Sequence, residues 1–258
     1  VLGVLLSAYG FLQSAAAMLG TGIEGVDRVS ALMLLTETSV GWALLARLAV
    51  LTILGIAALT PVLRRMAGLV LLTFLAAIAV ASLAWSGHGA ATEGPAGMVH
   101  LVSDIIHLLA AAAWIGALGA FVLIVSRRPQ TPETLNAAHR ALASFATVGA
   151  IIVGLIIATG LVNSYLLVGP RNVLRLAESD YGRLLLIKLT LFAIMLGLAA
   201  GNRFRLTPAL GKAIGRDGTA AAVARLKRSL WIETCAGILI LGLVAWLGTL
   251  PPPASGGS

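Results

Sequence analysis

The sequence predicts an all-α fold, a polytopic bundle of transmembrane helices. Three observations support this prediction: 59% of the 258 residues are hydrophobic, only 11% are charged, and the mean hydropathy is +0.99. An average soluble domain has about 25% charged residues. A chain with less than half of that share cannot cover a water-soluble surface of this size. The composition therefore excludes a soluble globular domain, a disordered chain and a nucleic-acid-binding module.

Runs of about 20 apolar residues, the length of helix that crosses a bilayer core of about 30 Å, occur seven times. The first run does not resemble a signal peptide, because no charged region precedes it and no cleavage signal follows it. Between the runs, Val29–Leu35 is predicted to form a short interfacial helix. Residues 87–98 and 169–180 are predicted to be irregular, the second broken by Pro170. The predicted spans are 1–19, 40–60, 67–86, 99–126, 141–168, 181–201 and 229–250.

Basic residues concentrate in alternate connections between the spans. Twelve of the 18 Lys and Arg residues lie in the second, fourth and sixth connections, and most acidic residues lie in the others. Because positively charged loops remain in the cytoplasm, this pattern predicts a multi-pass membrane protein whose C-terminus lies outside the cytoplasm. The net charge of +8 then reports topology and not a nucleic-acid partner. The twelve residues are Arg64, Arg65, Arg127, Arg128, Arg140, Arg203, Arg205, Lys212, Arg216, Arg225, Lys227 and Arg228.

Two short matches indicate an internal repeat. Val40–Leu48 aligns without gaps with Tyr181–Leu189, and each segment has a basic residue six positions after a glycine. Ala84–Gly87 likewise matches Ala245–Gly248. Both matches relate helices four spans apart, and an even separation of this kind produces parallel halves.

In this alignment the fourth span has no partner, and the missing helix would precede Val1. We therefore expect an eight-helix protein with a 4 + 4 parallel repeat, whose first helix lies before residue 1. Residues 1–250 are predicted to form a single transmembrane domain, and residues 251–258 a flexible tail outside the cytoplasm.

Polar residues inside the membrane cluster in the fourth span. His100, Asp104 and His107 are separated by four and three positions, which places them on one helical face together with Trp114. Ionisable groups at this depth are costly and usually mark an ion path or a relay. His88 ends the third span on the same outer side, twelve residues before His100. We therefore predict that these imidazoles and the carboxylate converge near the outer mouth.

Imidazole combined with carboxylate or thioether groups suits a transition metal, and thioether favours cuprous copper. Met98 and Met18 are the candidate thioether ligands. Two histidines seven positions apart on a helix are separated by about 10 Å, which predicts successive stations for the ion instead of one shared shell. The structural alternatives are a hydrogen-bonding histidine between helices and gap-filling methionines.

Three further charged residues lie within the predicted spans. Arg47, Lys188 and Glu233 are expected to form structural ion pairs or to extend toward the membrane surface.

Several motifs, in consistent order from about residue 13 to residue 252, together resemble the copper-resistance D family (CopD/PcoD). The family's first helix, which usually carries a histidine, has no counterpart in this sequence. The matching motifs are Ser86-Gly-His88, His100-Leu-x-x-Asp104-x-x-His107-Leu-Leu-Ala-Ala-x-x-Trp114-Ile-Gly116, Thr159-Gly-Leu-Val-Asn163, Tyr181-Gly-Arg-Leu-Leu-Leu-x-Lys188, Asn202-Arg-Phe-Arg-Leu-x-Pro208 and Leu247-Gly-Thr-Leu-Pro-Pro252.

The resemblance implies a non-enzymatic, multi-pass protein of the bacterial inner membrane with a periplasmic C-terminus. Such a protein moves copper, as Cu⁺ or Cu²⁺, from periplasm to cytoplasm and contributes to copper homeostasis and resistance. The resemblance also implies the periplasmic copper-binding protein CopC as a partner, alongside membrane lipid. One alternative is a haem-binding electron-transfer protein with paired axial imidazoles. The three membrane histidines all lie at the outer side, which argues against a two-haem wire across the bilayer. Another alternative is a copper sensor or scaffold that does not transport the ion.

Overall fold

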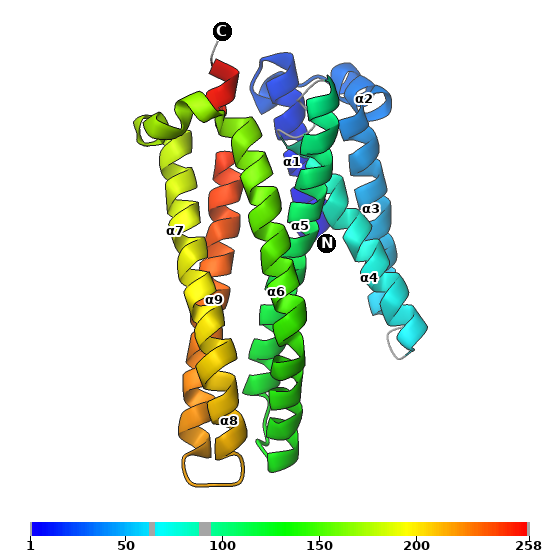
Figure 1. The fold of residues 1–258 in the computed structure, drawn as a ribbon. Coiled ribbons are helices and arrows are strands. Elements are labelled where there is room, and N and C mark those ends of the chain that lie inside the picture. Colours follow the sequence, from blue (N-terminus) through cyan, green and yellow to red (C-terminus); the bar gives the residue numbers. More distant parts are fainter. Residues whose placement is uncertain (1, 62–64, 88–93, 257–258) are drawn as a thin grey trace. The chain divides into compact units, whose positions relative to one another are not determined.

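The computed structural model describes residues 2–61, 65–87 and 94–256 (Figure 1). Within these ranges every regular element is a helix, and seven helices are long and apolar enough to cross a membrane. The predicted all-α polytopic fold is confirmed. The seven helical segments are Leu2–Leu19, Ser39–Ala58, Met66–Ser86, Gly94–Ser126, Pro132–Val168, Asp180–Ala213 and Thr219–Leu247. The chain divides into two compact units, residues 1–109 and 110–258, with the boundary inside one long helix.

The first unit is built around α3, which packs against α1, α2, α4 and the short helix η3. The helix expected at Val29–Leu35 is present as α2, and Asp27 caps its start by accepting hydrogen bonds from the backbone N–H groups of Val29 and Ser30. The elements are α1 (Leu2–Leu19), η1 (Ile23–Gly25), α2 (Arg28–Glu37), α3 (Ser39–Ala58), α4 (Met66–Ala81), η3 (Ser82–Ser86) and the first part of α5 (Gly94–Ser126).

The second unit packs α7 and α8 against α9. Its core includes Leu210, Leu226 and Leu230, which are almost completely buried. The expected tail begins with a short helical turn, and the Asn172 side-chain amide donates to the Pro253 carbonyl. Besides the end of α5, the elements are α6 (Pro132–Val168), η5 (Pro170–Glu178), α7 (Asp180–Gly201), η6 (Asn202–Leu206), α8 (Thr207–Ala213), α9 (Thr219–Leu247) and η7 (Pro253–Gly256).

Two helices of the second unit extend well beyond their predicted spans. Helix α6 begins at Pro132 instead of residue 141, and α9 begins at Thr219 instead of residue 229. Thr131 caps α6, and Pro132 occupies the first turn, where a missing N–H costs nothing. Hydropathy marks only the part of a helix that is apolar enough for lipid, so it misses the polar turns that continue the same helix.

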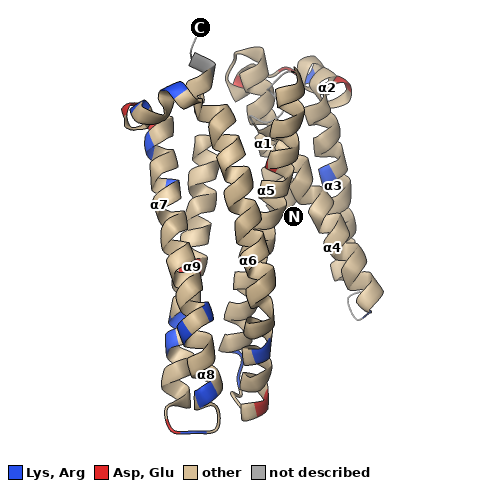
Figure 2. Cartoon of the chain, viewed as in Figure 1, with Lys and Arg blue, Asp and Glu red and all other residues tan. Residues whose placement is uncertain are grey.

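The charged residues of the second unit are distributed unequally between its two ends. Figure 2 shows most of the Lys and Arg of this unit near the α8–α9 connection and the start of α6, where acidic residues are few, whereas around η5 the two signs of charge are mixed. This distribution is the one that the positive-inside rule uses, and it is consistent with a cytoplasmic α8–α9 connection. The orientation itself remains a prediction.

The start of α3 has a specific local geometry. The Thr38 hydroxyl accepts a hydrogen bond of 3.1 Å from the Gly41 backbone N–H. A Cβ atom on Gly41 would lie only 2.2 Å from the Leu35 carbonyl oxygen, so this approach to the end of α2 requires glycine.

The start of α7 repeats this geometry. The Ser179 hydroxyl accepts a hydrogen bond of 3.1 Å from the Gly182 N–H, and a Cβ on Gly182 would lie 1.8 Å from the Leu176 carbonyl oxygen. The residues involved correspond one to one with those of α3 at a constant spacing in the chain. The starts of α3 and α7 are therefore similar in backbone packing as well as in residue type, which supports the internal repeat. The eighth helix stays a prediction.

Candidate metal-relay site on α5

Polar side chains line one face of α5 near its start. His100 is 1% exposed and Ser103 is also buried, while Asp104 and His107 are half-buried. The spacing of four and then three residues places these groups one above another on the helix. The predicted common face is therefore a buried face in the first unit, where each of the four side chains has an interaction partner.

The Asp104 carboxylate lies at the end of η3. A Cβ atom added to Gly87 would lie 3.7 Å from Asp104 Oδ2, an ordinary van der Waals distance. Gly87 immediately precedes His88 in the sequence, and His88 itself lies outside the described residues. The structure therefore brings Asp104 next to Gly87, the residue that precedes His88 in the sequence.

Arg47 of α3 connects to η3 through three hydrogen bonds. It is 6% exposed, and its Nε donates to Ser82 Oγ at 2.8 Å. Its Nη2 donates to the Ser82 carbonyl at 2.8 Å and to Ser86 Oγ at 3.3 Å. The expectation that Arg47 forms an ion pair or extends to the surface is thus replaced by another role. Its guanidinium binds neutral groups and ties α3 to the turn that ends beside Asp104.

The two candidate thioether ligands are not buried with the imidazoles. Met98 is 66% exposed and Met18 is 55% exposed. Side chains two positions apart on an α-helix point about 200° apart, so Met98 cannot share the direction of His100 within α5. Among the residues that the structure describes, no three His, Cys, Asp or Glu side chains form a group able to hold a metal ion. The ligand set His88, His100, Asp104, His107, Met98 and Met18 therefore stays a prediction.

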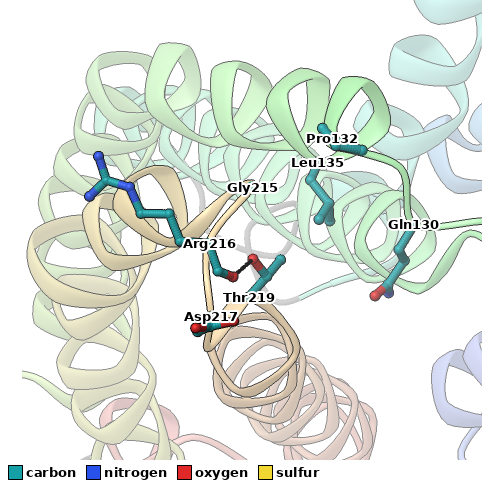
Figure 3. Close-up of a pocket in the computed structure, with 7 residues that line it drawn as sticks. All are labelled: Gln130, Pro132, Leu135, Gly215, Arg216, Asp217 and Thr219. Atoms are coloured by element: carbon teal, nitrogen blue, oxygen red, sulfur yellow. Dashed lines mark hydrogen bonds between the residues drawn. The ribbon is translucent and has the colours of Figure 1, made fainter.

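One cavity in the second unit, with a volume of about 640 Å³, lies between the start of α6 and the α8–α9 connection. Figure 3 shows that its polar side chains do not converge: Arg216 points away from the other lining residues, and Gln130 lies on the far side from it. The Thr219 hydroxyl donates to the Arg216 carbonyl at 2.8 Å, which closes the local turn. The polar side chains that line this cavity therefore do not point toward a common ligand position.

A second cavity, of about 280 Å³, contains a polar pair that sequence reasoning missed. Glu233 of α9 is 1% exposed, and the Asn202 side-chain amide donates to its Oε2 at 2.9 Å. Glu233 had been expected to form an ion pair or extend to the surface. An acidic residue inside an apolar run is itself a signal of function, but its partner is 31 residues away and only the fold brings them together.

Fold and site together define the class of the protein: a multi-pass helical membrane protein with buried imidazole and carboxylate groups. The family model for copper resistance protein D matches residues 139–247, and the model for the copper resistance protein D-like N-terminal domain matches residues 1–98. The chain belongs to the copper resistance protein D family.

Individual relatives agree with this assignment. The chain is 41% identical over its whole length to copper resistance protein D of Pseudomonas syringae pv. tomato and covers 83% of that protein. Inner membrane protein YebZ of Escherichia coli (strain K12) is 28% identical, with 96% of the chain and 81% of YebZ covered. Copper transport protein CutJ of Bacillus subtilis (strain 168) is 31% identical over 66% of the chain and 28% of CutJ. No solved structure matches the chain. The protein is thus a copper-related, multi-pass inner-membrane protein.

Proposed function

We propose that the protein carries copper ions across the bacterial inner membrane, from periplasm to cytoplasm, and so contributes to copper homeostasis and resistance. The observation that carries the proposal is the buried face of α5, where His100 is followed one turn later by Asp104 and then by His107. Groups of this kind are costly at membrane depth and mark ion paths when they occur. Family membership and the names of two relatives support copper as the ion.

In this proposal copper enters at the outer mouth and moves along α5. His88 and His100, with Met98 or Met18, capture the ion, and His107 receives it about 10 Å further along the helix. Asp104 lies between the two imidazoles in sequence and either ligates the ion or orients His107 as a hydrogen-bond acceptor. Imidazole and thioether groups suit Cu⁺, whereas imidazole and carboxylate groups also accept Cu²⁺.

The predicted topology is consistent with copper entry from the periplasm. The basic connections lie in the cytoplasm, which places the C-terminus and the start of α5 on the periplasmic side. A periplasmic copper-binding protein of the CopC type would then deliver the ion to the outer mouth.

The double substitution of His100 and His107 by alanine tests the proposal. We expect copper accumulation in cells that express the variant to fall to that of cells lacking the protein, because both imidazole stations are removed. Copper per cell is measured by metal analysis and divided by the amount of membrane-inserted protein. The matched control is His139→Ala, whose imidazole lies on α6 and packs over Gly211 of α8, outside the proposed path. Normal accumulation in the double variant would refute the relay.

Two other outcomes would support the competing functions. A Soret absorption band in the purified protein would identify a haem-binding electron-transfer protein, since axial imidazole ligation of haem produces it. Equal copper accumulation with and without the wild-type protein would instead favour a copper sensor or scaffold.

A further inference from the structure

The Glu233–Asn202 pair lies in the second unit, where α9 packs against η6. Glu233 follows Arg228, the last residue of the basic segment at the start of α9, by five positions, or about 7.5 Å along the helix. An ionised carboxylate at membrane depth is costly without a cation, so carboxyl groups in such places hold either a proton or a cation. The side chain of Glu233 is therefore an exchange site for one of these two.

Asn202 has capacity for a second hydrogen bond. Asn202 is 7% exposed, and its side-chain Oδ1 is buried without a hydrogen-bond partner among the described residues. A carboxylate accepts only, whereas a protonated carboxyl group also donates one O–H. In one orientation the Asn202 amide donates N–H to ionised Glu233, and after rotation its oxygen accepts the O–H of protonated Glu233. The pair can thus satisfy both protonation states.

The backbone at Asn202 is specialised for this position. Asn202–Leu206 forms a π-helical turn between α7 and α8, and Pro208 lies two residues after it. Proline has no N–H for the carbonyl four residues earlier, that of Phe204, and its ring crowds that carbonyl, which explains the wider turn. Single π-turns occur frequently at functional sites. Here the turn keeps Asn202 buried against α9.

The cavity wall contains few other groups that could act on Glu233. The lining residues of α5, α6 and α7 are uncharged, and the only other charged side chain among the described lining residues is Arg203 of η6. Arg203 Nη1 donates to the Ala146 carbonyl at 3.0 Å, and its guanidinium lies 5.2 Å from the ring centroid of Phe204. Glu233 is therefore the only carboxyl group among the described residues that line this cavity.

The donor set distinguishes a proton from a metal ion. The only lining side chains that carry oxygen are those of Glu233, Asn202 and Thr207 in the part of the chain that the structure describes. Hard cations such as Ca²⁺ and Mg²⁺ need about six oxygen ligands, and Cu⁺ prefers sulfur or imidazole. Neither requirement is met, whereas one carboxyl and one amide are sufficient for a proton.

We propose that Glu233 and Asn202 form a proton-binding site that exchanges its proton through the cavity as copper moves, so that copper entry is coupled to proton movement. The coupling rests on the proposed transport function, whereas the binding of the proton does not. The step is an acid–base exchange: Glu233 releases H⁺ to water and becomes a carboxylate that accepts from the Asn202 N–H, and uptake of H⁺ reverses it.

Infrared titration of the full chain in lipid nanodiscs tests proton binding without copper. We expect a carboxyl C=O band that appears and disappears with pH in the wild-type protein, is absent in Glu233→Gln and is shifted in Asn202→Ala. Glu233→Gln preserves the hydrogen bond with Asn202, so it should fold normally. Asp104→Asn is the control that assigns the band, because it removes the carboxyl group of the α5 site. If Glu233→Gln leaves every titrating band in place, or Mg²⁺ displaces the proton, the site is overturned.

Vesicles that contain the protein and an internal pH dye test the coupling. Wild-type protein should move protons whenever copper moves, and Glu233→Gln should lose the proton movement and the pH dependence of copper uptake. If the variant retains both, the coupling is wrong. If the wild-type protein moves no copper at all, the transport function fails, and the infrared result still decides whether the site binds a proton.

Discussion

Helices α3 and α7 begin in the same way but belong to units that bury different charges. Both start after a hydroxyl cap and have a glycine pressed against the preceding carbonyl, through Thr38 and Gly41 in one unit and Ser179 and Gly182 in the other. The first unit buries the Arg47 guanidinium, which three hydrogen bonds hold to η3.

The second unit buries a carboxylate instead. Glu233 is bonded to the Asn202 amide within an otherwise largely apolar cavity. The matching starts of α3 and α7 show that the same close packing of a helix against the preceding segment occurs in both units. A few polar groups, placed on that shared framework, distinguish the chemistry of one unit from that of the other.

The largest expected effect comes from substitutions that disrupt the close glycine contact at the starts of α3 and α7. In Gly182→Ala the new Cβ would lie 1.8 Å from a backbone oxygen, and in Gly41→Ala 2.2 Å, so in each case the helix must shift. Overpacking typically costs about 1–3 kcal/mol and occasionally more. We expect both variants to reach or exceed the upper end of this range, with Gly182→Ala the more destabilised, as measured by thermal unfolding in detergent.

Glycines near the C-terminal ends of the same helices provide the control for these substitutions. A Cβ on Gly55 of α3 or on Gly197 of α7 meets no atom within 4 Å. Alanine at either position should leave stability unchanged or raise it by up to about 1 kcal/mol, because alanine is the better helix former. Equal behaviour of all four variants would show that the close approach is not a shared constraint.

A smaller effect is expected where the two units differ, at Arg47. Arg47→Met keeps most of the side-chain volume but removes three hydrogen bonds and leaves the Ser82 carbonyl without this donor. An unsatisfied buried polar group costs about 1–3 kcal/mol, so the unfolding temperature should fall. Arg47→Lys keeps the charge and one or two donors and should lose less. Stability in Arg47→Met equal to that of the wild type would show that this connection is dispensable.

The smallest effect concerns the helices that precede α3 and α7. Helix α2 is capped by Asp27, whereas η5 follows Gly169 without a side-chain cap. Hydrogen bonds from the Ser30 backbone N–H and hydroxyl hold the pKa of Asp27 below its usual value of 3.8. A carboxyl group whose pKa is lower in the folded state stabilises that state at pH values above its unfolded-state pKa. This contribution is lost as the pH falls through the folded-state pKa.

Amide hydrogen exchange across α2 and η5 measures this difference. Protection of α2 should decrease as the pH falls below about 3.8, whereas protection of η5 should show no decrease from this cause. Asp27→Asn keeps a capping oxygen but cannot titrate, so its α2 protection should lose the pH dependence. The same loss of protection at low pH in Asp27→Asn would contradict a role for the carboxylate.

Much of the protein was predictable from its residues because the membrane imposes simple rules. Apolar length predicted seven spans, and helical spacing placed His100, Asp104 and His107 on one face, which the structure shows to be buried or half-buried. Both inferences depend only on neighbours along one helix. The polar extensions of α6 and α9 were missed because hydropathy reports lipid contact and not helix length.

Contacts between helices were decided only by the tertiary structure. Arg47 was expected to form an ion pair or to extend toward the membrane surface, yet its hydrogen-bond partners are hydroxyl and carbonyl groups of η3. Glu233 was expected to form an ion pair or to extend toward the membrane surface, yet it accepts a hydrogen bond from the side-chain amide of Asn202. A sequence states which polar groups a membrane must accommodate, because their cost depends on residue type alone. It does not state their partners, because these depend on which helices pack together and on where a proline widens a turn.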